Sequence, residues 1–177
     1  GGRYTVGLSQ LGAAKMTGID YGRDNIADAK RRVKNANIEN INFRQCDVLD
    51  IPYRDSSFDF VFSNGVLHHT TDPQRGIEEL YRVVKPNGTV WIFLYGRSLW
   101  WDLMELLRLV SLKIPRELTQ HSMQLMGYAP NRIFKFLDSL HVPIIESYST
   151  RQMKSMLRKA GFSELIQLNR CVNTPYF

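Results

Sequence analysis

The chain has 177 residues, 44% of them hydrophobic and 23% charged, which is the composition of a globular domain with one core. Two cysteines are too few for a disulfide framework and favour a reducing, cytoplasmic location, and the longest apolar run, residues 99–114, is too short and too charged to span a membrane. The net charge of +6 comes from basic residues that are scattered rather than clustered, so we do not expect a nucleic-acid partner.

The first part of the chain predicts helices and strands in alternation. Its apolar residues recur either at helical spacing or in short strand-like runs. In chain order, the pattern indicates a helix over residues 3–12, a strand over 15–20, a helix over 25–35 and a strand over 41–46. Asp24 precedes the second helix and is expected to cap it.

The alternation continues further along the chain. In order, the pattern predicts a strand over 58–63, a helix over 73–84, a turn over 85–88, a strand over 89–95, a helix over 150–160 and a strand over 162–171. Ser149 or Thr150 is expected to cap the last helix, and Gly161 is expected to end it. Strands that alternate with helices predict a doubly wound, Rossmann-like α/β sheet.

Residues 97–148 break this alternation. They hold two helical patterns, 99–114 and 131–140, and no strand of comparable strength. The first pattern includes Trp100 and Trp101 and is apolar around most of its circumference. We interpret the block as a helical insertion, or lid, that follows the fifth strand of the sheet and covers its carboxyl edge, where open α/β folds bind ligands.

Two aspartates follow strands of the expected sheet. Asp20 ends the strand over 15–20, where a carboxylate can accept hydrogen bonds from both hydroxyls of a ribose. Asp47 follows the strand over 41–46, where a carboxylate can accept a hydrogen bond from the amine of adenine. Gly2 lies 18 residues before Asp20, close to the usual spacing of about 20 between a glycine loop and the ribose-binding acid. Taken singly, Asp20 could equally be a turn or helix-capping residue, and Asp47 alone is better explained as a solvated turn at the end of the strand.

The run from Gln45 to Gly88 contains a more specific order of motifs. It reads Asp47-Val48-Leu49, Ile51-Pro52-Tyr53, Ser57-Phe58-Asp59, Leu67-His68-His69 and Lys85-Pro86-Asn87-Gly88. This order resembles the class I S-adenosylmethionine-dependent methyltransferases of the small-molecule type, those with a methyltransferase domain 11. Asn87 stands where that family usually has glycine, and asparagine tolerates the same left-handed backbone.

The resemblance implies a set of cofactor contacts at the ends of the strands. By analogy with the family, Gly1 and Gly2 would lie under the methionine part of S-adenosylmethionine, Asp20 and Tyr21 at its ribose, Asp47 and Val48 at its adenine, and Ser63 and Asn64 beside its sulfonium. The methyl acceptor would be a small molecule and the second product S-adenosylhomocysteine. The implied domains are a cofactor-binding methyltransferase core over 1–96, the lid over 97–148, and a helix and strand over 149–177 that complete the core.

The same resemblance covers only about residues 2–96 and lacks the start of the glycine loop. In this fold the first strand lies in the middle of the sheet and precedes that loop. We therefore expect the natural protein to continue upstream of Gly1, and also beyond Phe177.

His68 and His69 are the catalytic candidates, because a histidine base suits proton transfer near neutral pH. In the family, however, such a pair often has a structural role at the turn that follows the strand, and the sequence alone favours that role over catalysis. The cysteines and histidines show no metal-ligand spacing, so no metal is expected. Three other functions would each explain some of these features. Gly2 and Asp20 also suit a nicotinamide-dependent oxidoreductase, the incomplete glycine loop suits a non-catalytic module that binds S-adenosylmethionine, and the net positive charge suits an RNA methyltransferase.

Overall fold

The structure is a computed structural model of the chain. It describes residues 2–97, 113–130 and 146–168, together with residues 103, 108–109, 132–133 and 136–137. The chain divides into two compact units, Gly1–Val61 with Gln74–Val90 and Phe62–Pro73 with Trp91–Phe177, and each unit is considered by itself below.

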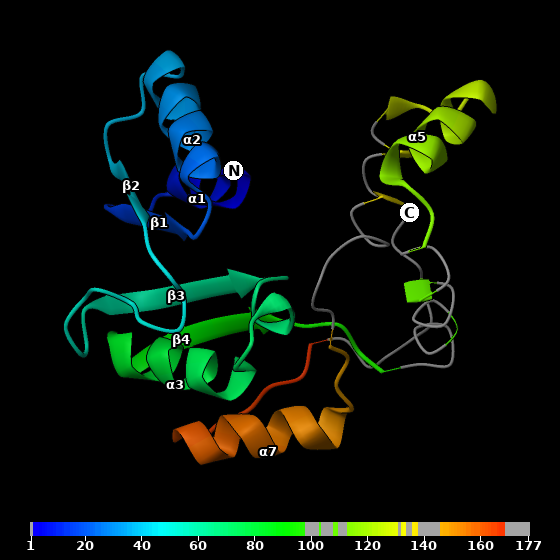
Figure 1. The fold of residues 1–177 in the computed structure, drawn as a ribbon. Coiled ribbons are helices and arrows are strands. Elements are labelled where there is room, and N and C mark those ends of the chain that lie inside the picture. The colour runs from blue at the N-terminus through cyan, green and yellow to red at the C-terminus, as the bar shows by residue number, and fades with distance from the viewer. Residues whose placement is uncertain are drawn as a thin grey trace. The chain divides into compact units, whose positions relative to one another are not determined.

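The elements alternate in the first part of the chain as the sequence predicts (Figure 1). In chain order they are α1 (Arg3–Gln10), β1 (Met16–Asp20), α2 (Arg23–Asn35), β2 (Ile41–Gln45), β3 (Phe58–Asn64), the short 3₁₀ helix η1 (Leu67–His69), α3 (Pro73–Val83), β4 (Val84–Phe93), α5 (Arg116–Leu125) and α7 (Thr150–Ala160). None of the helices in the described ranges is long and apolar enough to cross a membrane.

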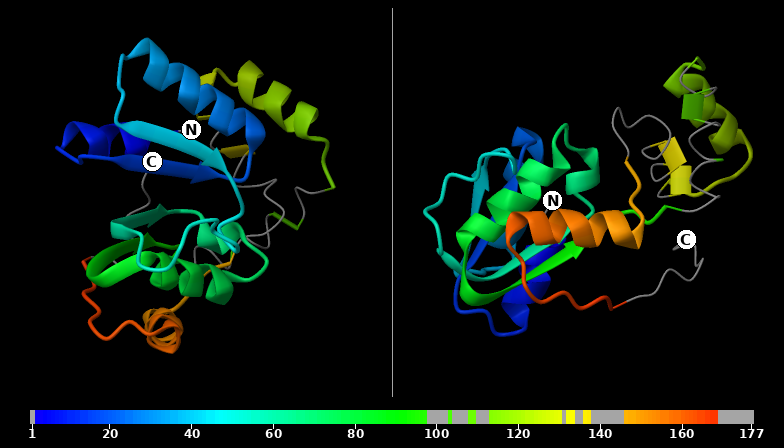
Figure 2. Two further views of the ribbon diagram at one scale, coloured as in Figure 1. Left: turned by 90° about the vertical axis from the view of Figure 1, so that its left-hand side faces the viewer. Right: turned by 90° about the horizontal axis from the view of Figure 1, so that it is seen from below.

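Strands β1 and β2 run parallel and are paired from Met16 with Ile41 to Asp20 with Gln45. Parallel strands need a crossover connection, and α2 provides it. One face of α2 buries Ile26, Ala29 and Val33 against Phe43 of β2. Figure 2 shows α2 lying along this pair of strands. The small apolar core of the first unit therefore joins a helix to the sheet through one aromatic ring.

Helix α2 begins earlier than the sequence predicts. Its N-cap is Gly22, and Asp24 lies in the first turn instead of at the cap. The cause lies at the end of β1, where Asp20 Oδ1 accepts hydrogen bonds from the amide of Gly22 at 2.8 Å and from Asn25 Nδ2 at 3.1 Å. These bonds turn the chain into the helix directly after the strand. The carboxylate of Asp24 remains favourable in the first turn, near the positive end of the helix dipole.

Strands β3 and β4 pair in a second two-stranded sheet, with α3 between them in the chain. The amide of Ser57 donates to the carbonyl of Val83 at 2.8 Å, and the amide of Gly65 donates to the carbonyl of Phe93 at 3.0 Å. From the first hydrogen bond to the second, the residue number rises on both sides, from Ser57 to Gly65 and from Val83 to Phe93. The two strands therefore run in the same direction.

The turn predicted over 85–88 is wrong, because β4 starts at Val84, directly after α3. A Cβ atom on Gly88 would lie 2.8 Å from the carbonyl oxygen of Asp59, so the chain already runs against β3 at this point. Asn87 takes the left-handed backbone that the sequence suggested, with φ 63°. The four residues therefore form an irregular start to the strand.

Helix α7 has both of its ends fixed by local sequence. Ser149 is the N-cap and forms a capping box with Gln152, and Gly161 is the C-cap with φ 114°. The strand predicted over 162–171 is wrong in its described part, since residues 162–168 form no strand. The amide of Phe162 is used by the helix end, where it donates to the carbonyl of Leu157, and Ile166 and Leu168 stay exposed.

The predicted lid is tested only in small part. Trp100, Trp101 and most of the two predicted helices lie outside the described residues. The structure adds α5, which the sequence pattern did not predict, and Met123 of this helix packs on Ile133 and Leu137. The division into core, lid and C-terminal segment stays a prediction.

A buried glycine in β1 offers a sharp test of the packing in the first unit. Gly18 pairs with Phe43, and a Cβ atom at Gly18 would lie 2.5 Å from two carbons of the Phe43 ring. We expect Gly18→Ala to lower the free energy of unfolding by about 1–3 kcal/mol, because the buried ring must move. Urea unfolding measures this change.

Gly7→Ala is the matched control, since a Cβ atom there meets no atom of the described residues within 4 Å. It lies inside α1 and should gain about 0.5–1 kcal/mol through helix propensity. In a Phe43→Leu background, the cost of Gly18→Ala should shrink. A cost that is the same in both backgrounds would show that the ring is not what restricts Gly18.

Candidate functional site

Asp20 and Asp47 lie at the same edge of the sheet in the first unit. Asp20 is the last residue of β1, and its carbonyl accepts a hydrogen bond from the amide of Cys46 at 3.1 Å. Asp47 comes two residues after the end of β2. Because β1 and β2 are parallel, both carboxylates stand at their carboxyl ends, where α/β folds bind ligands.

Among the described residues, each of these carboxylates is held by hydrogen bonds through only one of its oxygens. Asp20 Oδ1 accepts from Gly22 and Asn25, and Asp47 Oδ1 accepts from the amide of Leu49 at 2.9 Å. Both side chains are half-buried. The local bonds fix the orientation of each carboxylate, and the Oδ2 atoms can accept hydrogen bonds from the hydroxyl or amine groups of a ligand.

Gly2 occupies a position that only glycine fits. Its φ is 80°, and a Cβ atom would lie 3.0 Å from the Cβ of Ala29 and 3.1 Å from the ring of Phe43. The chain at the start of α1 therefore approaches the core of the unit as closely as a backbone can. Gly1, the other predicted glycine, lies outside the described residues.

Tyr21 directly follows β1, and Val48 comes three residues after the end of β2. The carbonyl of Tyr21 accepts a hydrogen bond from Gln45 Nε2 at 3.1 Å, which ties the end of β1 to β2. The ring of Tyr21 is exposed, and Val48 is half-buried. The structure thus brings four predicted residues, Asp20, Tyr21, Asp47 and Val48, to one edge.

The second unit contains the other predicted residues. Ser63 and Asn64 end β3, and Ser63 is buried with its hydroxyl oxygen lacking a hydrogen-bond partner among the described residues. His68 and His69 follow in η1. The predicted residues of this group therefore end β3 or follow it within five residues.

His68 is fully buried and packs between aromatic rings. Its ring centroid lies 4.1 Å from that of His69 and 3.9 Å from that of Tyr95. Both of its ring nitrogens lack hydrogen-bond partners in the described part of the chain. Burial, with a smaller contribution from the neighbouring His69, lowers the pKa of His68 from its usual 6.5 to about 4. His68 is therefore neutral at pH 7 and a weak proton acceptor.

Tyr95 and Tyr148 belong to this group but were missed in the sequence. The amide of Tyr148 donates to the carbonyl of Tyr95 at 2.9 Å, and the amide of Glu146 donates to the carbonyl of His68 at 3.0 Å. The Tyr148 hydroxyl also donates to the Glu146 carboxylate, and burial raises the pKa of Tyr148. Tyr95 could have been found from its place at the end of an apolar strand, whereas residues 146–148 carry no sequence signal.

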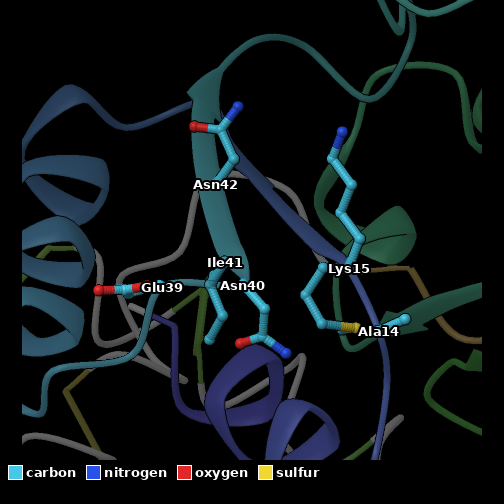
Figure 3. Close-up of a pocket in the computed structure, with 7 residues that line it drawn as sticks. Ala14, Lys15, Glu39, Asn40, Ile41 and Asn42 are labelled. Atoms are coloured by element: carbon cyan, nitrogen blue, oxygen red, sulfur yellow. The ribbon is translucent and has the colours of Figure 1, made fainter.

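A pocket of about 310 Å³ lies elsewhere in the first unit (Figure 3). Its lining residues come from the amino ends of β1 and β2 and are Ala14, Lys15, Met16, Glu39, Asn40, Ile41 and Asn42. This is the opposite end of the strands from Asp20 and Asp47. Asn40 is already engaged, because its Nδ2 donates to the carbonyl of Ala13 and its Oδ1 accepts from Ser9. We assign the pocket no part in the site.

Within the described ranges, histidine, cysteine and acidic side chains form no cluster of three or more that could hold a metal ion.

Comparison with known proteins adds independent evidence. Residues 1–92 match the family model described as a methyltransferase domain. Demethylmenaquinone methyltransferase of Oceanobacillus iheyensis is 29% identical over 91 residues, which are 50% of this chain and 38% of that protein. Phosphoethanolamine N-methyltransferase 2 of Caenorhabditis elegans is 31% identical over 81 residues, 46% of this chain and 18% of that protein. The chain thus corresponds to less than half the length of these relatives.

A solved structure of a Thermotoga maritima S-adenosylmethionine-dependent methyltransferase shares the fold, with a TM-score of 0.55 and 19% identity over 83% of this chain and 55% of that one. Similarity at this level supports the Rossmann-like α/β architecture that the sequence predicted. The family match covers more than half of the 177 residues, and the chain belongs to the class I S-adenosylmethionine-dependent methyltransferases with a methyltransferase domain.

Proposed function

We propose that the protein transfers a methyl group from S-adenosylmethionine to a small-molecule acceptor and releases S-adenosylhomocysteine. The observation that carries the proposal is the pair of oriented carboxylates, Asp20 and Asp47, at the carboxyl ends of two paired parallel strands. Each keeps one oxygen for a ligand, and an adenosine offers two hydroxyls and an amine to such acceptors.

The residues of the first unit fit the adenosine half of this cofactor. In the proposal, Asp20 Oδ2 accepts hydrogen bonds from the ribose hydroxyls beside Tyr21. Asp47 Oδ2 accepts from the adenine amine, and the amide of Val48 donates to a ring nitrogen. Gly2 supports this assignment, because it leaves bare backbone at the start of α1, where a side chain would collide with Ala29 and Phe43.

Methyl transfer from S-adenosylmethionine requires little acid–base chemistry from the protein. When bound, S-adenosylmethionine supplies an activated methyl group on a good leaving group. The chain must orient the acceptor in line with that bond and exclude water, which together can lower the barrier by about 7–11 kcal/mol. In the proposal, Ser63 and Asn64 contact the cofactor, beside its sulfonium, and do not contact the acceptor.

A general base is needed only for an acceptor that must lose a proton. His69 suits this role better than His68, because its side chain is half-buried, whereas that of His68 is fully buried and its lowered pKa makes it a weak proton acceptor.

The nature of the acceptor rests on the relatives. One is named for demethylmenaquinone and another for phosphoethanolamine, which differ in size, charge and accepting atom. What they share is that both are small molecules, and we carry only this property over to the present chain.

Cofactor binding can be tested at the two aspartates. We expect Asp20→Ala and Asp47→Ala each to weaken the binding of S-adenosylhomocysteine by about 1–3 kcal/mol, roughly 5- to 150-fold, since each leaves polar groups of the ligand unpaired. Isothermal titration calorimetry gives the affinity. Asp24→Ala and Asp50→Ala are matched controls, because both carboxylates are exposed and lie three or four residues away.

Unchanged affinity in both aspartate variants would contradict the assigned contacts. A methylation assay with a panel of small amines, phenols and quinols then tests turnover. Binding of S-adenosylhomocysteine without any methyl transfer would instead favour a non-catalytic cofactor-binding module.

A further inference from the structure

Helix α3 presents a buried carboxylate to the segment that follows Asp47. Glu79 is only 1% exposed. Its carboxylate accepts hydrogen bonds from the amide of Ile51 at 2.8 Å and from Arg82 at 2.6 and 3.0 Å, and it forms an ion pair with Arg75 at 3.0 Å. The bonds from Arg82 lower the pKa of Glu79, so it stays ionised at neutral pH.

Arg82 and Arg75 extend these contacts along the same segment. Arg82 Nη1 donates to the carbonyl of Tyr53 at 2.7 Å and to Asp55 at 2.8 Å, and Nη2 donates to the carbonyl of Ile51 at 2.7 Å. Arg75 Nε donates to the carbonyl of Leu49 at 3.3 Å. Three side chains of one helix therefore hold the backbone at alternate residues from 49 to 53.

The held segment has no regular secondary structure of its own. Its short-range backbone bonds are those of Asp50 to Asp47 at 3.2 Å and of Tyr53 to Ile51 at 2.8 Å. Apolar packing alone could attach it to α3 at lower desolvation cost, because burying a charged pair is expensive. Directional bonds to several backbone groups add something that packing lacks, namely a fixed position along the chain.

That position matters because the segment starts at the end of Asp47-Val48. The Asp47 carboxylate itself accepts from the amide of Leu49, the residue whose carbonyl Arg75 holds. We propose that Glu79 and Arg82 are positioning residues for cofactor recognition, which fix residues 49–53 and through them the orientation of Asp47 and Val48 toward adenine. The inference rests on the proposed function.

The experiment measures how well the protein distinguishes adenine from hypoxanthine. S-inosylhomocysteine carries an oxygen where S-adenosylhomocysteine carries the amine, so the ratio of their dissociation constants reports the Asp47 contact directly. In Arg82→Lys and Glu79→Gln, we expect about tenfold weaker binding of S-adenosylhomocysteine and a smaller change for the inosyl analogue. The dissociation constant of S-inosylhomocysteine divided by that of S-adenosylhomocysteine therefore falls toward the value expected for Asp47→Ala. In turnover, KM for the cofactor should rise while kcat stays close to its wild-type value.

Two further variants separate positioning from general stability. Lys85→Ala removes an ion pair of 2.7 Å with Asp59 in the same unit and should leave the ratio unchanged. Asp55→Ala removes one partner of Arg82 at an exposed site and should lower the ratio by a smaller factor. Thermal unfolding without ligand confirms that each variant is folded.

A double-mutant cycle provides the decisive result. If Arg82 acts through Asp47, adding Arg82→Lys to Asp47→Ala should cost much less than it does alone. Fully additive losses, or an unchanged ratio in folded Arg82→Lys, Glu79→Gln and Asp55→Ala, would overturn the proposal. A wild-type protein that binds neither ligand would overturn the proposed function itself, whereas wild-type discrimination with unaffected variants would overturn only the positioning role.

Discussion

Ile77→Ala is expected to lower the free energy of unfolding by about 2–5 kcal/mol. Ile77 lies on the buried face of α3 and has no exposed surface. Truncation to alanine removes three methyl or methylene carbons from a close-packed environment and leaves a cavity that the neighbouring side chains fill only in part. Urea unfolding at pH 7, followed by circular dichroism, gives the value.

Two variants of the same helix make the test specific. Ile77→Val removes a single carbon and should cost about 0.5–1.5 kcal/mol, so the losses should be graded with the volume removed. Glu78→Ala removes a hydrogen bond from Gln74 Nε2 at 2.9 Å and should cost no more than about 0.5 kcal/mol. Equal costs for Ile77→Ala and Glu78→Ala would show that Ile77 does not anchor the helix.

The protein should lose stability as the pH falls from about 6.5 to about 4, through the charging of His68. Its pKa is about 4 in the folded state and 6.5 when solvated, so between these values the unfolded chain binds more protons. Stability from neutral His68 is fully present above pH 6.5. It decreases by at most about 1.4 kcal/mol per pH unit as the pH falls toward 4.

Thermal or urea unfolding across pH 4–7.5 measures this dependence. His68→Phe keeps an aromatic ring against Tyr95 but cannot be protonated, so it should reduce the slope in this window. His121→Gln, at an exposed histidine of α5, is the control and should retain the wild-type slope. A slope that is the same in His68→Phe and the wild type would show that His68 does not titrate differently in the two states.

Most of the elements in residues 2–95, and also helix α7, could be predicted, because their limits are encoded locally. Pro73 opens α3 and Gly161 closes α7, as the sequence indicated. The errors fall where contacts outside the apolar pattern decide the outcome. Asp20 moves the start of α2 to Arg23 through side-chain hydrogen bonds to nearby residues, and the approach of Gly88 to the distant Asp59 converts an expected turn into the beginning of β4. Neither contact can be read from the spacing of apolar residues.

The residues of the candidate site also divide into those that the sequence could predict and those that it could not. Asp20 and Asp47 were recognisable because each lies at or just after the end of a predicted strand, and parallel strands place such residues at one edge. The hydrogen bonds that join Glu79 and Arg82 to residues 51–53 were not recognisable, because charged residues at this helical spacing are typical of a solvated helix face. The partners of these two side chains are backbone atoms about thirty residues away in the chain, such as the amide of Ile51 and the carbonyl of Tyr53.

The pairing of β1 with β2 also determines how this part of the protein folds. Met16 pairs with Ile41, so each pair joins residues that are 25 positions apart, and α2 accounts for 13 of the residues between them. A helix of that length is marginal on its own, and two parallel strands cannot meet until their connection is compact. The helix gains its stability by docking on Phe43, which the strand pairing holds in place. Helix and strands should therefore form in a single cooperative step, and a change at Phe43 should affect all three elements together.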